Sequence, residues 1–375
     1  MCFKRLFLID ILMIIITFVF CEYFIYQIAM NKCSWSDKNN QSNSHATKKL
    51  KTFFIADPHL LGPFRGHWFD KLRREWQMQR AFQASNNLLN PDIVFILGDL
   101  FDEGEIVDDK EWGYYMHRFR ERIFYMAKNE KLKIVVGNHD IGFHGTILRD
   151  MDKWMRFKET FGIESSVNLI KIHNITFVTI NSMSMKQDEG CTFCERAKHE
   201  IQMLNERLTL NKEKSNCRKE KDVIRCKTNG NAVLLQHFPL YRKNEAMCIG
   251  EDGPSKHLQN IENKESWDVL SEESTDFILQ MINPAFVLSG HAHHGCFVNR
   301  KGTWELSVPS FSWRNINNPS IVLGVFDDEE IILQKCYLPK ESTVINIYIA
   351  TAIYFIIFNF IQLKKYFHKT NKKIL

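Results

Sequence analysis

Five short motifs place metal-binding side chains directly after apolar runs. Together they supply carboxylate, imidazole and amide groups and no thiolate. This donor set suits two hard or borderline divalent cations, such as Mn²⁺, Fe²⁺ or Zn²⁺, better than a structural zinc ion. Any one of these residues alone would more often cap a turn or lie in a core, so the combination carries the prediction. The candidate ligands are Asp57, His59, Asp99, Asn138, His237, His291 and His293, and His139 directly follows one of them.

The spacing within the motifs favours shared ligation. Asp57 and His59 flank one proline, and side chains two residues apart share a face of an extended segment, so both can bind one ion. His291 and His293 repeat this arrangement. Asp99 follows a neighbouring apolar run and is placed to bridge two ions. His294 points away from His293 in such a segment, so we expect it to be exposed or to support a ligand.

The apolar runs themselves predict strands. They cover residues 52–56, 92–97, 133–136, 232–236 and 285–289. Continuous apolar runs of this length are typical of strands buried on both faces. Helical stretches at 69–89 and 111–128 separate the first three runs, which is typical of an α/β sheet. Sites in such sheets form at the carboxyl ends of the strands, so we expect the five motifs to meet at one edge.

The second half of the chain predicts a further sheet. Residues 166–183 have the pattern of a hairpin with Asn174 near its turn, and residues 320–338 have that of a second hairpin about Asp327 and Asp328. A sheet packed on the first would accommodate them. An insertion rich in cysteine and lysine at 186–229 interrupts this region, and residues 194–210 within it predict a helix.

Both ends of the chain predict membrane spans. Residues 6–28 and 343–363 are long and apolar enough to cross a bilayer. The alternative for the first is a cleaved signal peptide, but no small-residue cleavage motif follows it, which favours a retained signal anchor within 1–28. Basic residues beside each span place both ends in the cytosol. A linker at 29–49 and a catalytic domain at 50–339 would then be luminal, and 364–375 would form a cytosolic tail.

Cysteine usage fits a luminal domain. Eight of the ten cysteines lie between the spans, and an even number in an oxidising compartment indicates disulfides. Cys191, Cys194, Cys217 and Cys226 have zinc binding as their alternative. Glycosylation sequons at Asn40 and Asn174 are consistent with the same side of the membrane. The net charge of +5 comes largely from the termini, so we expect no nucleic-acid partner.

The motifs resemble those of the calcineurin-like metallophosphoesterase superfamily. They read DPH, GDLFDEG, GNHD, HFP and GHAH, between Asp57 and His293. The resemblance implies an α/β fold, a two-sheet αββα sandwich that binds two metal ions and hydrolyses phosphate esters. The stretches FFIADPHLLG, RREWQMQRAFQ and LQHFPLYR, with the flanking spans, are similar to a membrane-held, manganese-dependent branch. That branch removes the ethanolamine phosphate on the second mannose of glycosylphosphatidylinositol (GPI) anchors.

The resemblance also implies a role for each residue. Asp57, His59 and His293 would hold one ion. Asn138, His237 and His291 would hold the other, and Asp99 would bridge the two. His139 would be the general acid that protonates the leaving group. His67, Trp68, His144 and Arg242 are further candidates for contact with substrate.

The C-terminal tail predicts a location. Lys372 and Lys373 stand three and four residues from the end, which resembles the dilysine signal for return to the endoplasmic reticulum. An ordinary basic membrane flank is the alternative. The signal would make the COPI coat a partner and place the protein in the endoplasmic reticulum, the intermediate compartment and the Golgi. GPI-anchored proteins would be substrates, and trimming would promote their exit. The alternatives are another luminal phosphoesterase and an inactive scaffold.

Overall fold

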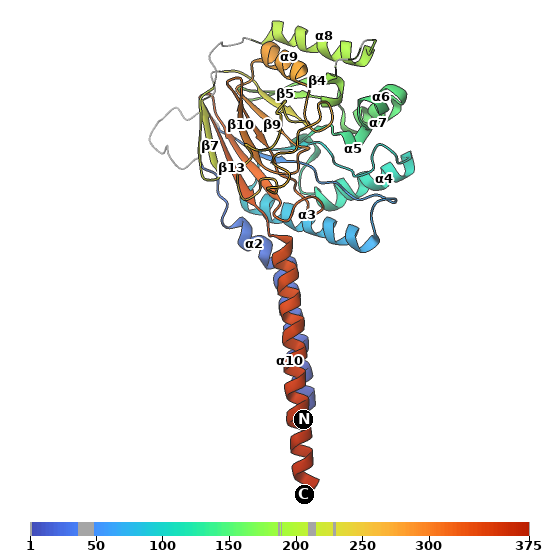
Figure 1. Ribbon diagram of the computed structural model, residues 1–375, viewed down its shortest axis with the longest axis vertical. Coiled ribbons are helices and arrows are strands. Elements are labelled where there is room, and N and C mark those ends of the chain that lie inside the picture. Colours follow the sequence, from blue (N-terminus) through green and yellow to red (C-terminus); the bar gives the residue numbers. More distant parts are fainter. Residues whose placement is uncertain are drawn as a thin grey trace.

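The chain folds into two β-sheets packed face to face, with helices outside them and a helical stalk below (Figure 1). A computed structural model describes residues 2–36, 49–186, 188, 190–208, 215–227 and 230–374. The predicted two-sheet sandwich is confirmed. The expectation about the strands is confirmed too, but the five strands that precede the motifs divide between the sheets.

The first sheet has seven strands and carries the first three motifs. Its order is β3-β2-β1-β12-β13-β7-β6, with β1, β2 and β3 parallel. The strands are β1 (Leu50–Ile55), β2 (Ile93–Leu97), β3 (Leu132–Val135), β6 (Cys217–Glu220), β7 (Val223–Lys227), β12 (Ser320–Phe326) and β13 (Glu330–Tyr337). The predicted hairpin about Asp327 and Asp328 is β12 with β13.

The second sheet has six strands and carries the other two motifs. Its order is β10-β11-β9-β8-β5-β4, with β5, β8 and β9 parallel. The strands are β4 (Val167–Ile172), β5 (Ile175–Ile180), β8 (Val233–Gln236), β9 (Phe286–Ser289), β10 (Cys296–Arg300) and β11 (Thr303–Ser307). Asn174 lies in the β4–β5 turn, as predicted.

Alternation along β1 explains why the motif-bearing strands are apolar throughout. Phe54 packs between the sheets, 5.4 Å from the ring of Phe95 on β2. Phe53 and Ile55 point the other way, into a core shared with α3. Successive side chains of a strand face opposite sides, so a strand covered on both faces must be apolar at every position.

Helices cover the outer faces of the sandwich. They are α3 (Trp68–Leu89), α4 (Asp109–His117), α5 (Asn138–Ile141), α6 (His144–Arg149), α7 (Asp152–Phe161), α8 (Thr192–Arg207) and α9 (Glu272–Ile282). The helix predicted at 111–128 is wrong in its second half. The α-helix passes at Arg118 into a π-helix, η2 (Arg118–Ile123), and ends there, with Phe119 and Ile123 both fully buried.

The stalk consists of both chain ends lying side by side (Figure 1). The first end is helical through α1 (Cys2–Val19), η1 (Phe20–Phe24) and α2 (Ile25–Met30), and the second is α10 (Glu341–Ile374). Each contains a segment long and apolar enough to cross a membrane, Phe7–Met30 and Glu341–Lys365. The Tyr348 hydroxyl donates to Glu22 across the pair at 2.6 Å. Both chain ends lie at the same tip of the stalk, which is the arrangement that two crossings require.

The predicted linker is wrong over its first eight residues. Met30 is buried in the core of the domain, and Trp35 stacks on Phe53 and donates to the Leu89 carbonyl at 2.8 Å. Cys33 is bonded to Cys336 at the end of β13. The domain is therefore seated directly on the stalk. Residues 37–48, with the sequon at Asn40, lie outside the described residues.

All eight cysteines between the spans form disulfides, as predicted. The pairs are Cys33–Cys336, Cys191–Cys194, Cys217–Cys226 and Cys248–Cys296. The alternative of zinc binding by Cys191, Cys194, Cys217 and Cys226 is wrong, because these four residues form two local bridges. One of the bridges joins directly opposed residues of β6 and β7. The bridge from Cys248 to Cys296 has a consequence for the site, because Cys296 follows His293 of the GHAH motif by three residues.

Candidate metal centre

The candidate ligands come from both sheets and meet where the carboxyl ends of the strands converge. Asp57, Asp99 and Asn138 follow β1, β2 and β3, whereas His237 and His291 follow β8 and β9. One edge of a single sheet was the simplest expectation, and the structure instead closes the site between the edges of two sheets. Ligands from two sheets can surround an ion on more sides than a single edge allows.

The backbone at most of the ligands is left-handed. Five candidate ligands have φ between 47° and 67°, and they are Asp57, His59, Asp99, His291 and His293. Such values are uncommon for residues other than glycine and cluster at functional sites. The reasoning that placed Asp57 and His59 on one face of an extended segment is therefore wrong. The side chains converge because the backbone turns at each ligand, held by bonds such as His59 N–H to the Asp99 carbonyl at 3.0 Å.

One group of ligands gathers around His59. Suitable atoms of Asp57, His59, Asp99 and His293 all lie within 4.8 Å of one another. The Nε2 atoms of His59 and His293 are 3.1 Å apart, and His59 Nε2 is 3.4 Å from Asp99 Oδ2. His59 Nδ1 lies 3.1 Å from the Asp102 carboxylate. A proton on Nδ1 satisfies that carboxylate and leaves the Nε2 lone pair free for a cation.

A second group gathers around His237 and shares Asp99 with the first. Suitable atoms of Asp99, His237 and His291 again lie within 4.8 Å of one another. His237 Nδ1 is 2.7 Å from the Leu97 carbonyl, so Nε2 faces Asp99 Oδ2 at 3.3 Å and Asn138 Oδ1 at 3.1 Å. His291 Nε2 is 2.8 Å from the Trp267 carbonyl, which leaves the Nδ1 atom of His291 free to bind a cation.

Unsatisfied buried atoms show that the residues present fit cations. Asp99 Oδ2 and His291 Nδ1 are buried and have no hydrogen-bond partner among the residues that the structure describes. A buried acceptor without a partner is costly, and a charged one more so. Two divalent cations would satisfy both atoms, and oxygen and imidazole donors are the ligands that such cations prefer.

Burial and mutual charge also perturb the ligands strongly. Burial raises the pKa of the Asp57 carboxyl to about 8. Burial, helped by the charge of His237, lowers the pKa of the His291 imidazole to about 3. Burial opposes a charge on His237 as well, but the Asp99 carboxylate outweighs it and raises that pKa to about 9. Crowded groups that cannot all keep their ordinary charges together are typical of functional sites.

His139 lies beside the candidate ligands, with its ring 4.8 Å from the ring of His59. Its backbone N–H donates to Asp99 Oδ1 at 2.8 Å, which orients the carboxylate that both groups share. Its ring Nδ1 is 2.9 Å from the Asp102 carbonyl, and the ring is partly exposed. A proton donated from Nδ1 to this carbonyl leaves Nε2 as the atom that can face a bound substrate. Arg65 approaches Nδ1 at 3.4 Å from the outer side.

The sequence interpretation missed two supporting carboxylates. Asp102 orients His59, as described. Asp140 accepts from the backbone N–H groups of Leu100, Phe101 and Gly137 at 2.9–3.1 Å and so joins the loops after β2 and β3. Both residues lie inside motifs that were singled out, GDLFDEG and GNHD, and an acid next to a ligand was the available signal.

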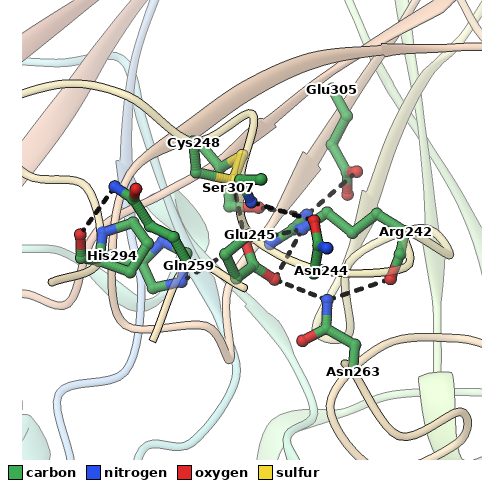
Figure 2. The surroundings of a disulfide bond; sticks show 12 residues. Arg242, Asn244, Glu245, Cys248, Gln259, Asn263, His294, Glu305 and Ser307 are labelled. Carbon is green, nitrogen blue, oxygen red and sulfur yellow. Dashed lines mark hydrogen bonds and ion pairs between the residues drawn. A yellow bond between two sulfur atoms is a disulfide. The ribbon is translucent and has the colours of Figure 1, made fainter. Parts of the chain in front are cut away.

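The remaining candidates divide by burial. His67 and Trp68 are exposed at the start of α3. His144 is buried and pairs with Asp188 at 2.8 Å, and the Arg242 guanidinium donates to Glu245 at 2.9 Å (Figure 2). His294 lies 3.6 Å from the Glu245 carboxylate and belongs to neither of the two groups of candidate ligands described above.

Comparisons with known proteins converge on one family. The model of the calcineurin-like phosphoesterase family matches residues 50–295. A rat protein, metallophosphoesterase 1 of Rattus norvegicus, is 42% identical over 359 residues, which cover 94% of this chain and 89% of the rat protein. Metallophosphoesterase 1 of Danio rerio is 41% identical over 361 residues, which cover 93% and 90% of the two chains.

Proposed function

Because the chain belongs to the calcineurin-like metallophosphoesterase family and is a metal-dependent phosphoesterase, we propose that it is a phosphodiesterase for GPI anchors. It would remove the ethanolamine phosphate from the second mannose, in the lumen of the early secretory pathway. The observation that carries this proposal is the pair of candidate ligand groups that share Asp99, in a domain that is seated directly on two candidate membrane helices. A phosphodiester carried by a membrane lipid is the substrate that such a placement favours.

The ligand groups assign the residues of each ion. Asp57, His59 and His293 would hold one cation, Asn138, His237 and His291 would hold the other, and Asp99 would contact both. Two divalent cations supply Lewis acidity toward the phosphoryl oxygens and lower the pKa of water. We propose Mn²⁺, because carboxylate, amide and imidazole donors without thiolate suit it.

His139 would act on the leaving group. A sugar alkoxide is a poor leaving group, so a proton supplied as the bond breaks lowers the barrier. The Asp102 carbonyl holds Nδ1 of His139 at 2.9 Å, which fixes the ring and directs Nε2 outward. The same Asp102 orients His59 through its carboxylate, so one residue positions both the acid and a ligand.

The location rests on features of the two ends. Basic residues beside both spans favour cytosolic ends, and the disulfide-bonded domain would then be luminal. Lys372 and Lys373 would bind the COPI coat and return the protein from the Golgi to the endoplasmic reticulum. Trimming of GPI-anchored proteins there would promote their exit. The membrane and GPI-anchored proteins are the proposed partners.

An assay of the full-length chain tests the activity. The purified protein would be reconstituted with Mn²⁺ at graded concentrations and given a glycolipid with ethanolamine phosphate on the second mannose. A matched glycolipid with that group on another mannose is the control substrate. We expect release of ethanolamine phosphate from the first at a kcat/KM at least about tenfold higher. Equal rates would overturn the proposed specificity, and activity without added or bound metal would overturn the metal requirement.

A further inference from the structure

Six large apolar side chains stand exposed on two segments of the domain, one that runs from a loop into the first turns of α3 and one that is a loop after β8. They are more than half exposed, between 55% and 76%, where most apolar side chains of the domain are buried. Exposed apolar side chains in contiguous patches mark interaction surfaces. The six residues, which we call the apolar rim, are Phe64, Trp68, Phe69, Leu72, Met247 and Ile249.

Both segments of the apolar rim are tied to the point where the second candidate span begins. Arg73 and Arg74, next to Leu72, both pair with Glu341, the former at 3.3 Å. Glu251, two residues after Ile249, pairs with Lys340 at 3.6 Å. Glu341 is the first residue of the candidate span Glu341–Lys365. Two separate segments thus bring their apolar side chains to the level at which the chain would enter the membrane.

Helix α3 runs along the side of the domain that faces the stalk. It lies across the base of the domain, where the stalk begins (Figure 1). Trp76 packs on Tyr23 of the first candidate span at 5.6 Å, and Arg80 lies over the same Tyr23 ring. Phe69 and Leu72 precede Trp76 by seven and four residues, a spacing that puts them on the same helix face. The face of α3 that contacts the stalk therefore extends beyond it as exposed apolar side chains.

The rim is also joined to the metal centre. Glu103 accepts from the Phe64 backbone N–H at 3.0 Å, and Arg65 donates to the Asp102 carbonyl, which also faces His139, at 3.0 Å. On the other loop, Glu245 lies 3.6 Å from His294, and the Cys248–Cys296 bridge fastens the loop to the histidine motif (Figure 2). Both segments of the rim are thus held close to the motifs that carry the candidate ligands.

We propose that the apolar rim inserts into the interface of the bilayer that holds the two spans. The occupant of this surface is the lipid of the chain's own membrane leaflet, because both segments of the rim are anchored where the second span begins. Tryptophan and phenylalanine are suited to this depth, where an apolar ring meets polar headgroups. The metal centre then opens at the membrane surface, and its substrate class is a phosphodiester on a lipid-linked headgroup. This last step rests on the proposed function and on the two helices crossing a bilayer.

Fluorescence quenching tests the insertion without using activity. Full-length protein would be reconstituted in phosphatidylcholine vesicles with bromine near the headgroup end of the acyl chains. Trp68→Phe should reduce by at least a third the amount of tryptophan emission that the brominated lipid quenches. Trp154→Phe, which alters a buried side chain of α7, should leave it unchanged. Equal quenching in the wild type and Trp68→Phe would overturn the insertion.

A split between substrates tests the consequence for catalysis. The variant Phe69→Ser/Leu72→Ser should lose at least tenfold in kcat/KM on a vesicle-embedded phosphodiester and less than twofold on a soluble nitrophenyl diester. Leu169→Ser/Met203→Ser is the matched control, because these exposed apolar residues lie on β4 and α8, at the far end of the domain from the stalk (Figure 1). Equal losses on both substrates would overturn the proposal. Intact quenching with no activity on any GPI lipid would refute the proposed function and leave the membrane contact standing.

Discussion

In one half of the metal centre a side-chain carboxylate orients the imidazole, whereas in the other half backbone carbonyls do so. Asp102 faces Nδ1 of His59, and the carbonyls of Leu97 and Trp267 face His237 and His291. A carboxylate partner raises the basicity of the imidazole more than a neutral carbonyl does. It can also be removed by substitution. The two halves should therefore respond differently to mutation, and Asp99 should be the residue at which they respond together.

Asp99→Asn should give the largest effect, because Asp99 belongs to both ligand groups. The substitution keeps the shape and removes the charge that would face two cations. We expect loss of both ions and a fall in turnover of roughly 10³-fold or more, since several kcal/mol of charge stabilisation disappear. Metal content would be measured by elemental analysis of the purified protein. A variant with both ions and near-normal turnover would remove the basis for a two-metal site.

His139→Ala should slow turnover and leave metal binding unchanged in both halves of the site. Its side chain is not in contact with Asp99, and only its backbone N–H holds that carboxylate, which alanine retains. We expect full metal content and turnover slower by ~10²–10⁴, the usual contribution of a positioned general acid.

The choice of leaving group supplies the control for His139. A sugar alkoxide needs protonation and nitrophenolate hardly does, so the loss should be far larger on the natural diester. If both substrates lose activity equally at unchanged metal content, His139 stabilises the phosphoryl group instead of protonating the leaving group.

Asp102→Asn should weaken metal binding in the His59 half and leave the His237 half unchanged. The amide can no longer accept a charge-assisted bond from His59 Nδ1, while the backbone carbonyl that holds His139 remains. Affinity for one of the two ions should fall about 10- to 100-fold, the usual cost of losing such a partner. Titration calorimetry would show one weakened site and one unchanged site. Asp108→Asn, which alters the exposed N-cap of α4, is the control, and equal weakening of both sites would show that the halves are not independent.

The convergence of the candidate ligands was predictable from the sequence, and the residues that support them were not. Apolar strands ending in DPH, GNHD or GHAH carry both the fold and the donor atoms in short stretches, so a local pattern suffices. The left-handed backbone at His59 or His293 leaves no such pattern, because it is enforced by hydrogen bonds to segments far along the chain. The same holds for the seating of residues 29–36 on the domain, where tertiary contacts override a polar composition that predicts a linker.

Ser182 is such a hidden support, and its substitution should give the smallest effect. Its hydroxyl oxygen accepts from the backbone N–H groups of His237 and Phe238 at 3.2 and 2.9 Å, although it lies 55 residues away in the sequence. Ser182→Ala leaves two buried donors unpaired and should lower the free energy of unfolding by about 1–3 kcal/mol. The imidazole of His237 stays fixed by the Leu97 carbonyl, so the affinity of that half should fall by less than about tenfold.

Ser184→Ala is the matched control for Ser182→Ala. Ser184 is also buried and lies with Ser182 in one short 3-10 helix, η4 (Ser182–Met185), but its hydroxyl donates to the Asn181 carbonyl. Chemical denaturation should show that both variants are destabilised, whereas calorimetry should show weakened metal binding in Ser182→Ala alone. If Ser182→Ala weakens the His237 half as strongly as Asp102→Asn weakens the His59 half, backbone support and carboxylate support are equivalent. The contrast between the two halves would then come from the imidazoles themselves.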